Sequence, residues 1–267
     1  MTVRKGARTL KDIPADILQQ LNTGQIESVN LMECLAIDQQ VLLQQVLKQQ
    51  QREHYFSEIQ QQIEQIKKPT FNSLNATIGK TLFQLSQQYQ DHECLTILKN
   101  HPADTVRNWS CYSVVENHQL SLAERFQQIY PLAADHHFGV REVAWMAIRP
   151  CIIQQLNDSI EILAAWIKDD DANIRRFASE ATRPRGVWCH HIDALKQQPE
   201  LALSILQPLY ADPAKYVQDS VGNWLNDASK TQPEFVLKLC EQWQQQSESK
   251  ATQYIVKKAL RTLNKTS

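Results

Sequence analysis

The stretch RRFASEATRPRGVW, residues 175–188, gathers side chains capable of chemistry into a short segment that starts as a helix and runs into a proline. It holds four guanidinium groups and one carboxylate: Arg175, Arg176, Arg183, Arg185 and Glu180. Trp188 ends it. Guanidinium groups bind phosphates, and indole faces attract cations. An ion pair at the helix end explains the same spacing, because Glu180 lies four residues after Arg176 and three before Arg183. Both interpretations stay open.

This stretch belongs to one of four repeated helical segments. Four segments share a β-branched residue that follows an Asp or Pro cluster and opens a helix: Val106, Val140, Ile174 and Val217. These anchors are spaced by 34, 34 and 43 residues, and another helical pattern lies between consecutive ones. Two helices in each such period are typical of HEAT-like hairpins, which bury their apolar faces by stacking. The sequence predicts an all-α, HEAT-like solenoid of antiparallel hairpins, curved with a concave cleft.

The predicted solenoid takes in the whole chain as one elongated domain, residues 1–267. Helices fill residues 1–100, the repeats occupy 101–245, and a capping helix covers 246–267. A content of only six glycines in 267 residues favours helices over β-rich folds. Within the repeats, four aspartates are expected to cap first helical turns: Asp104, Asp135, Asp171 and Asp212.

Basic residues concentrate on the helices that begin at the four anchors, which we expect to line the concave side. The net charge of -1 excludes a bulk electrostatic attraction to nucleic acid, so any such affinity needs a local basic face. The expected face comprises Arg149, Arg176, Arg183, Arg185, Lys215 and Lys230. An alternative stays open for Arg107, Arg141 and Arg175, which in HEAT hairpins can pair with aspartates of neighbouring repeats.

Several other classes of protein lack support. The six cysteines are scattered without a CxxC pair, which indicates reduced intracellular thiols. The N-terminus shows no signal peptide, and no apolar stretch is long enough to span a membrane. Cys189, His190 and His191 are adjacent and lack the spacing of a metal site, so we expect no metal. Without a P-loop, GxGxxG or GxSxG motif, no cofactor is expected either.

Three segments carry a family resemblance: VREVAWMAIRP, IRRFASEATRPRGVW and YVQDSVGNWLNDASK. From about residue 101 to 245 the chain resembles the AlkC-type branch of the DNA alkylation repair glycosylases, HEAT-like proteins related to AlkD. The resemblance implies removal of bases that N-alkylation has made cationic, in a basic concave cleft that holds the DNA. It places Glu180 on the acidic position of the SExTRP motif beside the lesion, Trp188 on the aromatic ending that motif, and Asp227 on the aspartate of LND.

The resemblance thus implies Asp227 and Glu180 as catalytic carboxylates and Trp188 as a lesion contact. Two places depart from the family pattern. Gly186 and Val187 stand where the family often has Leu-Pro before the tryptophan. Trp145 stands where the family usually has a glutamate, and the nearest carboxylate, Glu142, lies one turn earlier. Trp145 and Glu142 are therefore further candidates for contacting the lesion. Capping of a helix end is the alternative role for Asp227.

The chemistry implied by the resemblance suits these residue types. A cationic alkylated purine of the N3-methyladenine type leaves as a neutral base and needs no general acid. A buried carboxylate can stabilise the positive charge of the remaining oxocarbenium-like sugar and accept the proton of the attacking water.

The expected partner is double-stranded DNA carrying alkylated bases. We expect a monomer in the bacterial cytoplasm, associated with the nucleoid when it acts, with no membrane partner. The competing function is a non-enzymatic HEAT module that binds damaged or branched DNA, or a protein scaffold.

Overall fold

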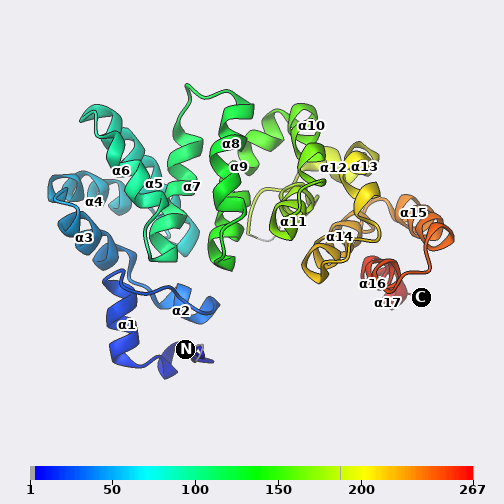
Figure 1. Ribbon diagram of the computed structural model, residues 1–267, viewed down its shortest axis with the longest axis horizontal. Coiled ribbons are helices and arrows are strands. Elements are labelled where there is room, and N and C mark those ends of the chain that lie inside the picture. The colour runs from blue at the N-terminus through cyan, green and yellow to red at the C-terminus, as the bar shows by residue number, and fades with distance from the viewer. Residues whose placement is uncertain (1–3, 187, 267) are drawn as a thin grey trace. The chain divides into compact units, whose positions relative to one another are not determined.

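The computed structural model describes residues 4–186 and 188–266, and every regular element in these ranges is a helix. The all-α fold expected from the sequence is therefore confirmed (Figure 1). The chain divides into two compact units: residues 1–121 with 135–147, and residues 122–134 with 148–267. Helix α9, Phe138–Gln154, contributes residues to both. None of the described helices is long and apolar enough to cross a membrane.

The first unit contains the helices of the N-terminal half. They are η1 (Leu10–Asp12), α1 (Ala15–Asn22), α2 (Leu31–Ala36), α3 (Gln39–Gln49), η2 (Glu53–Tyr55), α4 (Phe56–Glu64), α5 (Phe71–Gln88), α6 (His92–Lys99), α7 (Asp104–Glu116) and the first part of α9. Helices α5 and α7 approach closely at Gly79, where a Cβ would lie 2.2 Å from the carbonyl oxygen of Trp109. Ser113 Oγ donates to the Gly79 carbonyl at 2.7 Å, and the indole of Trp109 is buried in this core.

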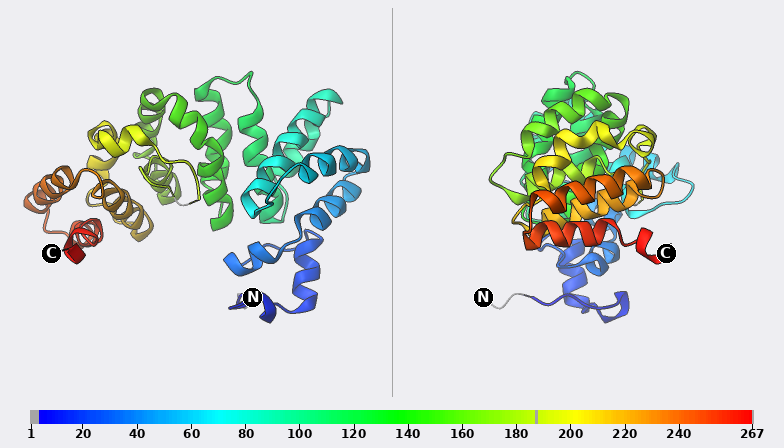
Figure 2. Two further views of the ribbon diagram at one scale, coloured as in Figure 1. Left: turned by 180° about the vertical axis from the view of Figure 1, so that it is seen from behind. Right: turned by 90° about the vertical axis from the view of Figure 1, so that its right-hand side faces the viewer.

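The second unit contains α8 (Leu122–Ala133), the last part of α9, α10 (Leu156–Trp166), α11 (Ala172–Ala181), α12 (Asp193–Gln197), η3 (Pro199–Ala202), α13 (Leu203–Leu206), η4 (Gln207–Leu209), α14 (Lys215–Ala228), α15 (Pro233–Gln246), α16 (Lys250–Ala259) and α17 (Leu263–Thr266). Helix α14 packs against both α11 and α16. Figure 2 shows α14, α15 and α16 following one another toward the C-terminal end of this unit. The predicted anchors Ile174 and Val217 are fully buried here, as are Val106 and Val140 in the first unit.

The residue after each anchor makes the same backbone contact in all four repeats. Its side chain donates to the carbonyl oxygens five and six residues earlier, in the turn before the helix. The donors are Arg107, Arg141, Arg175 and Gln218. Arg107 also pairs with Asp135 in the first unit, and Arg175 with Asp212 in the second, at 2.8 and 2.7 Å. The structural role left open for these arginines is therefore confirmed at Arg107 and Arg175.

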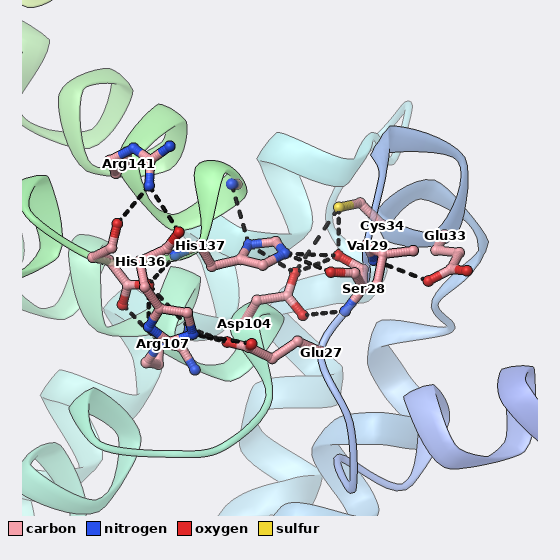
Figure 3. Close-up of polar contacts among 12 residues, drawn as sticks. Glu27, Ser28, Val29, Glu33, Cys34, Asp104, Arg107, His136, His137 and Arg141 are labelled. Carbon is pink, nitrogen blue, oxygen red and sulfur yellow. Dashed lines mark hydrogen bonds and ion pairs between the residues drawn. The ribbon is translucent and has the colours of Figure 1, made fainter. Parts of the chain in front are cut away.

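Of the four predicted caps, Asp171 is confirmed, whereas Asp104 and Asp212 are wrong, because α7 and α14 have no side-chain hydrogen bond at their N-caps, Ala103 and Ala214. Asp171 accepts from Asn173 N as the N-cap of α11, and Asp135 and Asp212 accept from the N–H two residues later, just before their helices. Asp104 instead points toward the N-terminal segment, where its oxygens accept from Ser28 N and Ser28 Oγ (Figure 3).

A histidine makes the hydrogen bond in the turn before α7 that Asp135 and Asp212 make before their helices. His101 Nδ1 accepts from Ala103 N, in the place that the aspartates take in the other repeats. The sequence pattern of an aspartate near the anchor could not distinguish these neighbouring positions, because a histidine nitrogen can accept the same bond.

Candidate functional site

Two carboxylates meet at the C-terminal ends of α11 and α14. Glu180 comes from α11 and Asp227 from α14, and both side chains are buried. Arg183, just after α11, joins them. Its Nη1 donates to Glu180 Oε1 at 2.8 Å, while Nε and Nη2 donate to Asp227 Oδ2 at 2.9 and 2.7 Å. We call Glu180, Asp227 and Arg183 the carboxylate cluster. The structure thus brings together two side chains 47 residues apart in the sequence.

Further side chains complete the surroundings of the cluster. Ser220 Oγ donates to Glu180 Oε2 at 2.7 Å, and Arg176 Nη2 lies 3.4 Å from the same oxygen. Lys230 Nζ lies 3.3 Å from Asp227 Oδ1. Each carboxylate therefore has two side-chain cations beside it, with Arg183 shared between them.

The charges around Glu180 determine its protonation. Burial alone would raise the pKa of Glu180, but the charges of Arg176 and Arg183 and the Ser220 hydrogen bond lower it below its usual range. Glu180 is thus ionised at neutral pH. Burial acts on Arg183 in the opposite direction, yet the two carboxylates hold the pKa of Arg183 above its ordinary value. A buried, ionised carboxylate can stabilise positive charge that develops nearby, and can accept a proton.

The alternatives left open for the two carboxylates have different outcomes. The ion pairs expected for Glu180 with residues four before and three after it are present, with Arg176 and Arg183. Capping is not the role of Asp227, whose oxygens accept from the side chains of Arg183 and Lys230. The ion pairs of Glu180 are compatible with chemistry at the cluster, since they keep this carboxylate charged.

Trp188 lies in the loop between α11 and α12. Its side chain is exposed, with 76% of the residue accessible, and its backbone has a φ of 59°, in the left-handed region. Bulky residues rarely adopt this conformation, which costs on the order of 1–3 kcal/mol and persists where the surroundings impose it. The loop is closed at its base by a hydrogen bond from Ile192 N to the Pro184 carbonyl at 3.1 Å. An exposed indole at this position can contact a ligand.

Arg149 is not the surface residue that the sequence predicts. Only 1% of it is accessible, and its guanidinium donates to the backbone carbonyls of Ala181, Arg183 and His190 at 2.8, 2.5 and 2.7 Å. A buried guanidinium bonded to three carbonyls does not reach a phosphate. The expected DNA contact is therefore wrong at Arg149, because the end of α11 and the loop after it fold over this side chain.

The other predicted DNA contacts differ in exposure. Arg176 is buried beneath the Tyr216 ring, 4.6 Å from its centroid, and pairs with Glu180, so the expected phosphate contact is also wrong there. Arg185 is half-buried, and its Nε donates to the Asp227 carbonyl at 3.3 Å. Lys215 and Lys230 have exposed side chains, which lie next to Asp219 and Asp227. Lys215, Lys230 and Arg185 stay candidates for DNA contacts.

Trp145 and Glu142 belong to the first unit and contact each other. Trp145 Nε1 donates to Glu142 Oε2 at 2.9 Å, across one turn of α9. Trp145 is 3% accessible, so the expected lesion contact by its indole is wrong in this structure. Glu142 is half-buried and its expected lesion contact stays a prediction.

Two residues of the site escaped the sequence analysis. Ser220 donates to Glu180, and Tyr216 covers Arg176. A signal was available, because Tyr216, Ser220 and Asp227 follow one another at intervals of four and seven residues and so share one face of α14. Arg176 and Glu180 share a face of α11 by the same spacing.

No group of three His, Cys, Asp or Glu side chains in residues 4–186 and 188–266 is arranged to hold a metal ion. Cys189 is half-buried, while His190 and His191 are exposed.

Comparisons with known proteins agree with this picture. Residues 143–263 match the family described as DNA alkylation repair enzyme. The uncharacterized protein YhaZ of Bacillus subtilis (strain 168) is 37% identical over 147 residues, which are 55% of this chain and 40% of that protein. The chain thus spans less than half the length of this curated relative.

Two solved structures share the fold. The Pseudomonas fluorescens alkylpurine DNA glycosylase AlkC, bound to DNA containing an abasic site analog, is similar with a TM-score of 0.68 and 24% identity over 97% of this chain and 66% of that one. AlkD2 from Streptococcus mutans is similar with a TM-score of 0.57 and 20% identity over 78% of this chain and 97% of that one. The chain thus shares its fold with AlkC and AlkD2, and the segment that matches the DNA alkylation repair enzyme family, residues 143–263, includes Glu180, Trp188 and Asp227.

Proposed function

We propose that this protein hydrolyses the N-glycosidic bond of cationic alkylated bases, of the N3-methyladenine type, in double-stranded DNA. It acts as a monofunctional glycosylase and as a monomer in the bacterial cytoplasm, associated with the nucleoid. The observation that carries the proposal is the carboxylate cluster, in which Arg183 holds Glu180 and Asp227 together by contacts of 2.7 to 2.9 Å. The family match over residues 143–263 supports the same class of activity.

The reaction balances without a cofactor. The glycosidic bond breaks with its electron pair going to the base, which is cationic before the step and neutral after it. The sugar becomes oxocarbenium-like, and a water forms the new bond to its anomeric carbon. Asp227 stabilises the sugar cation and takes the proton of the water, and Glu180 adds its negative charge. Both carboxylates must be ionised for this work, which the lowered pKa of Glu180 favours.

Trp188 and the exposed cations complete the proposed site. The indole of Trp188 lies open to solvent, and its face attracts the cationic base by about 0.5–2 kcal/mol. Arg185, Lys215 and Lys230 are the candidates for phosphate contacts, which orient the duplex without reading its sequence. No other group needs to donate a proton, because the base leaves uncharged.

The test is base release from alkylated DNA. Duplex DNA treated with a methylating agent is incubated with the protein, and free bases are separated by chromatography while abasic sites are counted by alkaline strand cleavage. We expect release of N3-methyladenine together with an equal number of abasic sites, and no release from untreated duplex. Abasic sites without free base, or no release from any methylated duplex, would contradict the proposal.

A non-enzymatic module for binding damaged DNA is the second candidate. The observation that favours it is the pairing of both carboxylates with arginine or lysine, which leaves them with balanced charge in the structure. This candidate predicts that the protein binds methylated duplex more tightly than untreated duplex and leaves every glycosidic bond intact. The chromatographic experiment therefore separates the two functions.

A further inference from the structure

We infer that Arg149 is a positioning residue for Trp188: it fixes the loop that presents this indole and acts on catalysis only through it. The effect on base release rests on the proposed function, whereas the structural effect on Trp188 does not. Three observations carry the inference: the hydrogen bonds of the guanidinium, the close approach of the loop backbone, and the exposure of the indole.

The guanidinium of Arg149 ties both arms of the loop. Nη1 and Nη2 donate to the carbonyls of Ala181 and Arg183, where the chain leaves α11. Nε donates to the carbonyl of His190, on the other side of Trp188. A planar group with five donors in a fixed fork can hold three carbonyls at once, which a lysine ammonium cannot do with the same geometry. Trp188 thus lies between two backbone segments bound to one buried cation.

The loop backbone also lies directly against this cation. A Cβ on Gly186 would be 3.2 Å from Arg149 Cζ and 2.2 Å from Cys189 Sγ. A side chain at position 186 would therefore push the loop away from the guanidinium or displace the thiol. The glycine allows the close approach that the hydrogen bonds require.

Trp188 depends on this backbone support more than a packed residue would. Three quarters of it is accessible, so few neighbouring side chains restrain the indole. Its left-handed φ of 59° is unfavourable for a bulky residue and persists only where the surroundings impose it. The contacts of Arg149 on either side of Trp188 supply that restraint. Loss of the guanidinium should release Trp188 into the extended conformations that an unrestrained tryptophan prefers.

The direct test observes Trp188 in the free protein. The chain has six tryptophans, which 5-fluorotryptophan labelling turns into six fluorine NMR signals, and Trp188→Phe identifies the one from Trp188. In Arg149→Met we expect this signal to shift and to approach the position of an unstructured peptide, while the signal of the buried Trp243 stays in place. Arg149→Lys should shift it less.

Arg175→Met is the matched control. Arg175 belongs to the same unit and donates to two backbone carbonyls and a carboxylate, yet its contacts lie at the start of α11. Its loss should leave the Trp188 signal unchanged. A Trp188 signal unaffected by Arg149→Met, or equally affected by Arg175→Met, would overturn the inference.

A double-mutant cycle tests the consequence for catalysis. With enzyme in excess over methylated duplex, Arg149→Met should lower the rate of base release about tenfold with DNA affinity within about twofold of wild type. In a Trp188→Ala background the same change should have less than about a twofold effect, because the side chain that Arg149 positions is already gone. Equal losses in both backgrounds would show that Arg149 acts through general stability and would overturn the inference.

The two proposals fail in different ways. If the wild-type protein releases no base from methylated DNA, the proposed function fails, and the fluorine signal of Trp188 still decides the role of Arg149. If wild type releases base but the cycle is additive, the positioning role fails and the glycosylase activity stands.

Discussion

The helices α11 and α14 are joined by arginine–carboxylate contacts at both ends, and the two ends differ in kind. At the start, Arg175 pairs with one carboxylate, Asp212. At the end, Arg183 pairs with two, Glu180 and Asp227. The contact at the start recurs in the first unit, where Arg107 pairs with Asp135.

Among the hydrogen bonds and ion pairs described for residues 4–186 and 188–266, the contact at the end is not repeated at the corresponding positions of the other repeats. Six residues after the anchors, where the third repeat has Glu180, the other three have Tyr112, Met146 and Asn223. The contact at the start is therefore part of a pattern that two repeats share, whereas the cluster is not. Burying charges is costly even when they are paired, so an unrepeated group of buried carboxylates favours a role other than holding the stack together.

The largest expected effect is a loss of activity when a carboxylate at the end of the two helices is neutralised. Asp227→Asn keeps the shape of the side chain and removes its charge, so base release should fall by about a hundred- to a thousandfold. Affinity for methylated duplex should stay nearly unchanged. Glu180→Gln should give a smaller loss, because Glu180 only adds negative charge. The measurements are rates of base release with excess enzyme and binding by fluorescence anisotropy. A folded Asp227→Asn with full activity would contradict the assignment.

The contact at the start of the helices should matter for stability. Asp212→Asn leaves the guanidinium of Arg175 without its charged partner, and we expect a loss of about 3 kcal/mol in the free energy of unfolding. Urea denaturation followed by circular dichroism gives this value. An unchanged unfolding midpoint would show that the repeated contact does not hold the hairpins together.

The ionisation of Glu180 should make the stability of the carboxylate cluster depend on pH. The pKa of Glu180 lies below its ordinary value of 4.5 in the folded protein, so its ionisation stabilises the fold above that value. This contribution is lost as the pH falls through the lowered pKa. Wild type should therefore lose more unfolding free energy than Glu180→Gln between about pH 6 and about pH 3. Parallel curves for the two proteins would refute the coupling to Arg176 and Arg183.

A smaller effect is expected at the loop beyond the cluster. Trp188→Gly relieves the left-handed backbone, so the free energy of unfolding should stay level or rise by about 1 kcal/mol. Base release should nevertheless fall about tenfold, because the indole no longer faces the cationic base. Unfolding curves and release rates on the same preparation check both parts. A variant that loses stability without losing activity would assign Trp188 to the fold.

The smallest effect concerns phosphate contacts. Lys215→Ala should weaken DNA binding modestly and reduce the slope of log affinity against log salt by about one. Lys196→Ala is the matched control, since Lys196 also pairs with a nearby aspartate in its own helix but is not among the predicted contacts. Equal slopes for both variants and wild type would remove Lys215 from the interface.

The repeat could be predicted from the sequence because its signals are local. An anchor, the donor after it and the acidic turn before it all lie within a few residues, so their spacing reports helix starts directly. Asp104 shows the limit, because its partner Ser28 is 76 residues away and no local pattern indicates it.

The sequence named candidate residues for the site, but it did not predict that two of the arginines among them are buried. The family resemblance implied Glu180, Trp188 and Asp227 as candidates, and the structure brings the two carboxylates together. Arg149 and Arg176 were expected at the surface because arginine is usually exposed. Their burial depends on a loop that folds over one and on a tyrosine of α14 that covers the other. These are contacts between elements, which helical periodicity does not encode.

The most direct test of the account compares two aspartates in the same helix pair. Asp212→Asn and Asp227→Asn remove the same charge from the partner of an arginine, at opposite ends of α11 and α14. Rates of N3-methyladenine release are measured with both variants folded and in excess over the same methylated duplex. The account predicts a rate within about threefold of wild type for Asp212→Asn and a loss of about a hundredfold or more for Asp227→Asn. Similar rates for the two variants would contradict it.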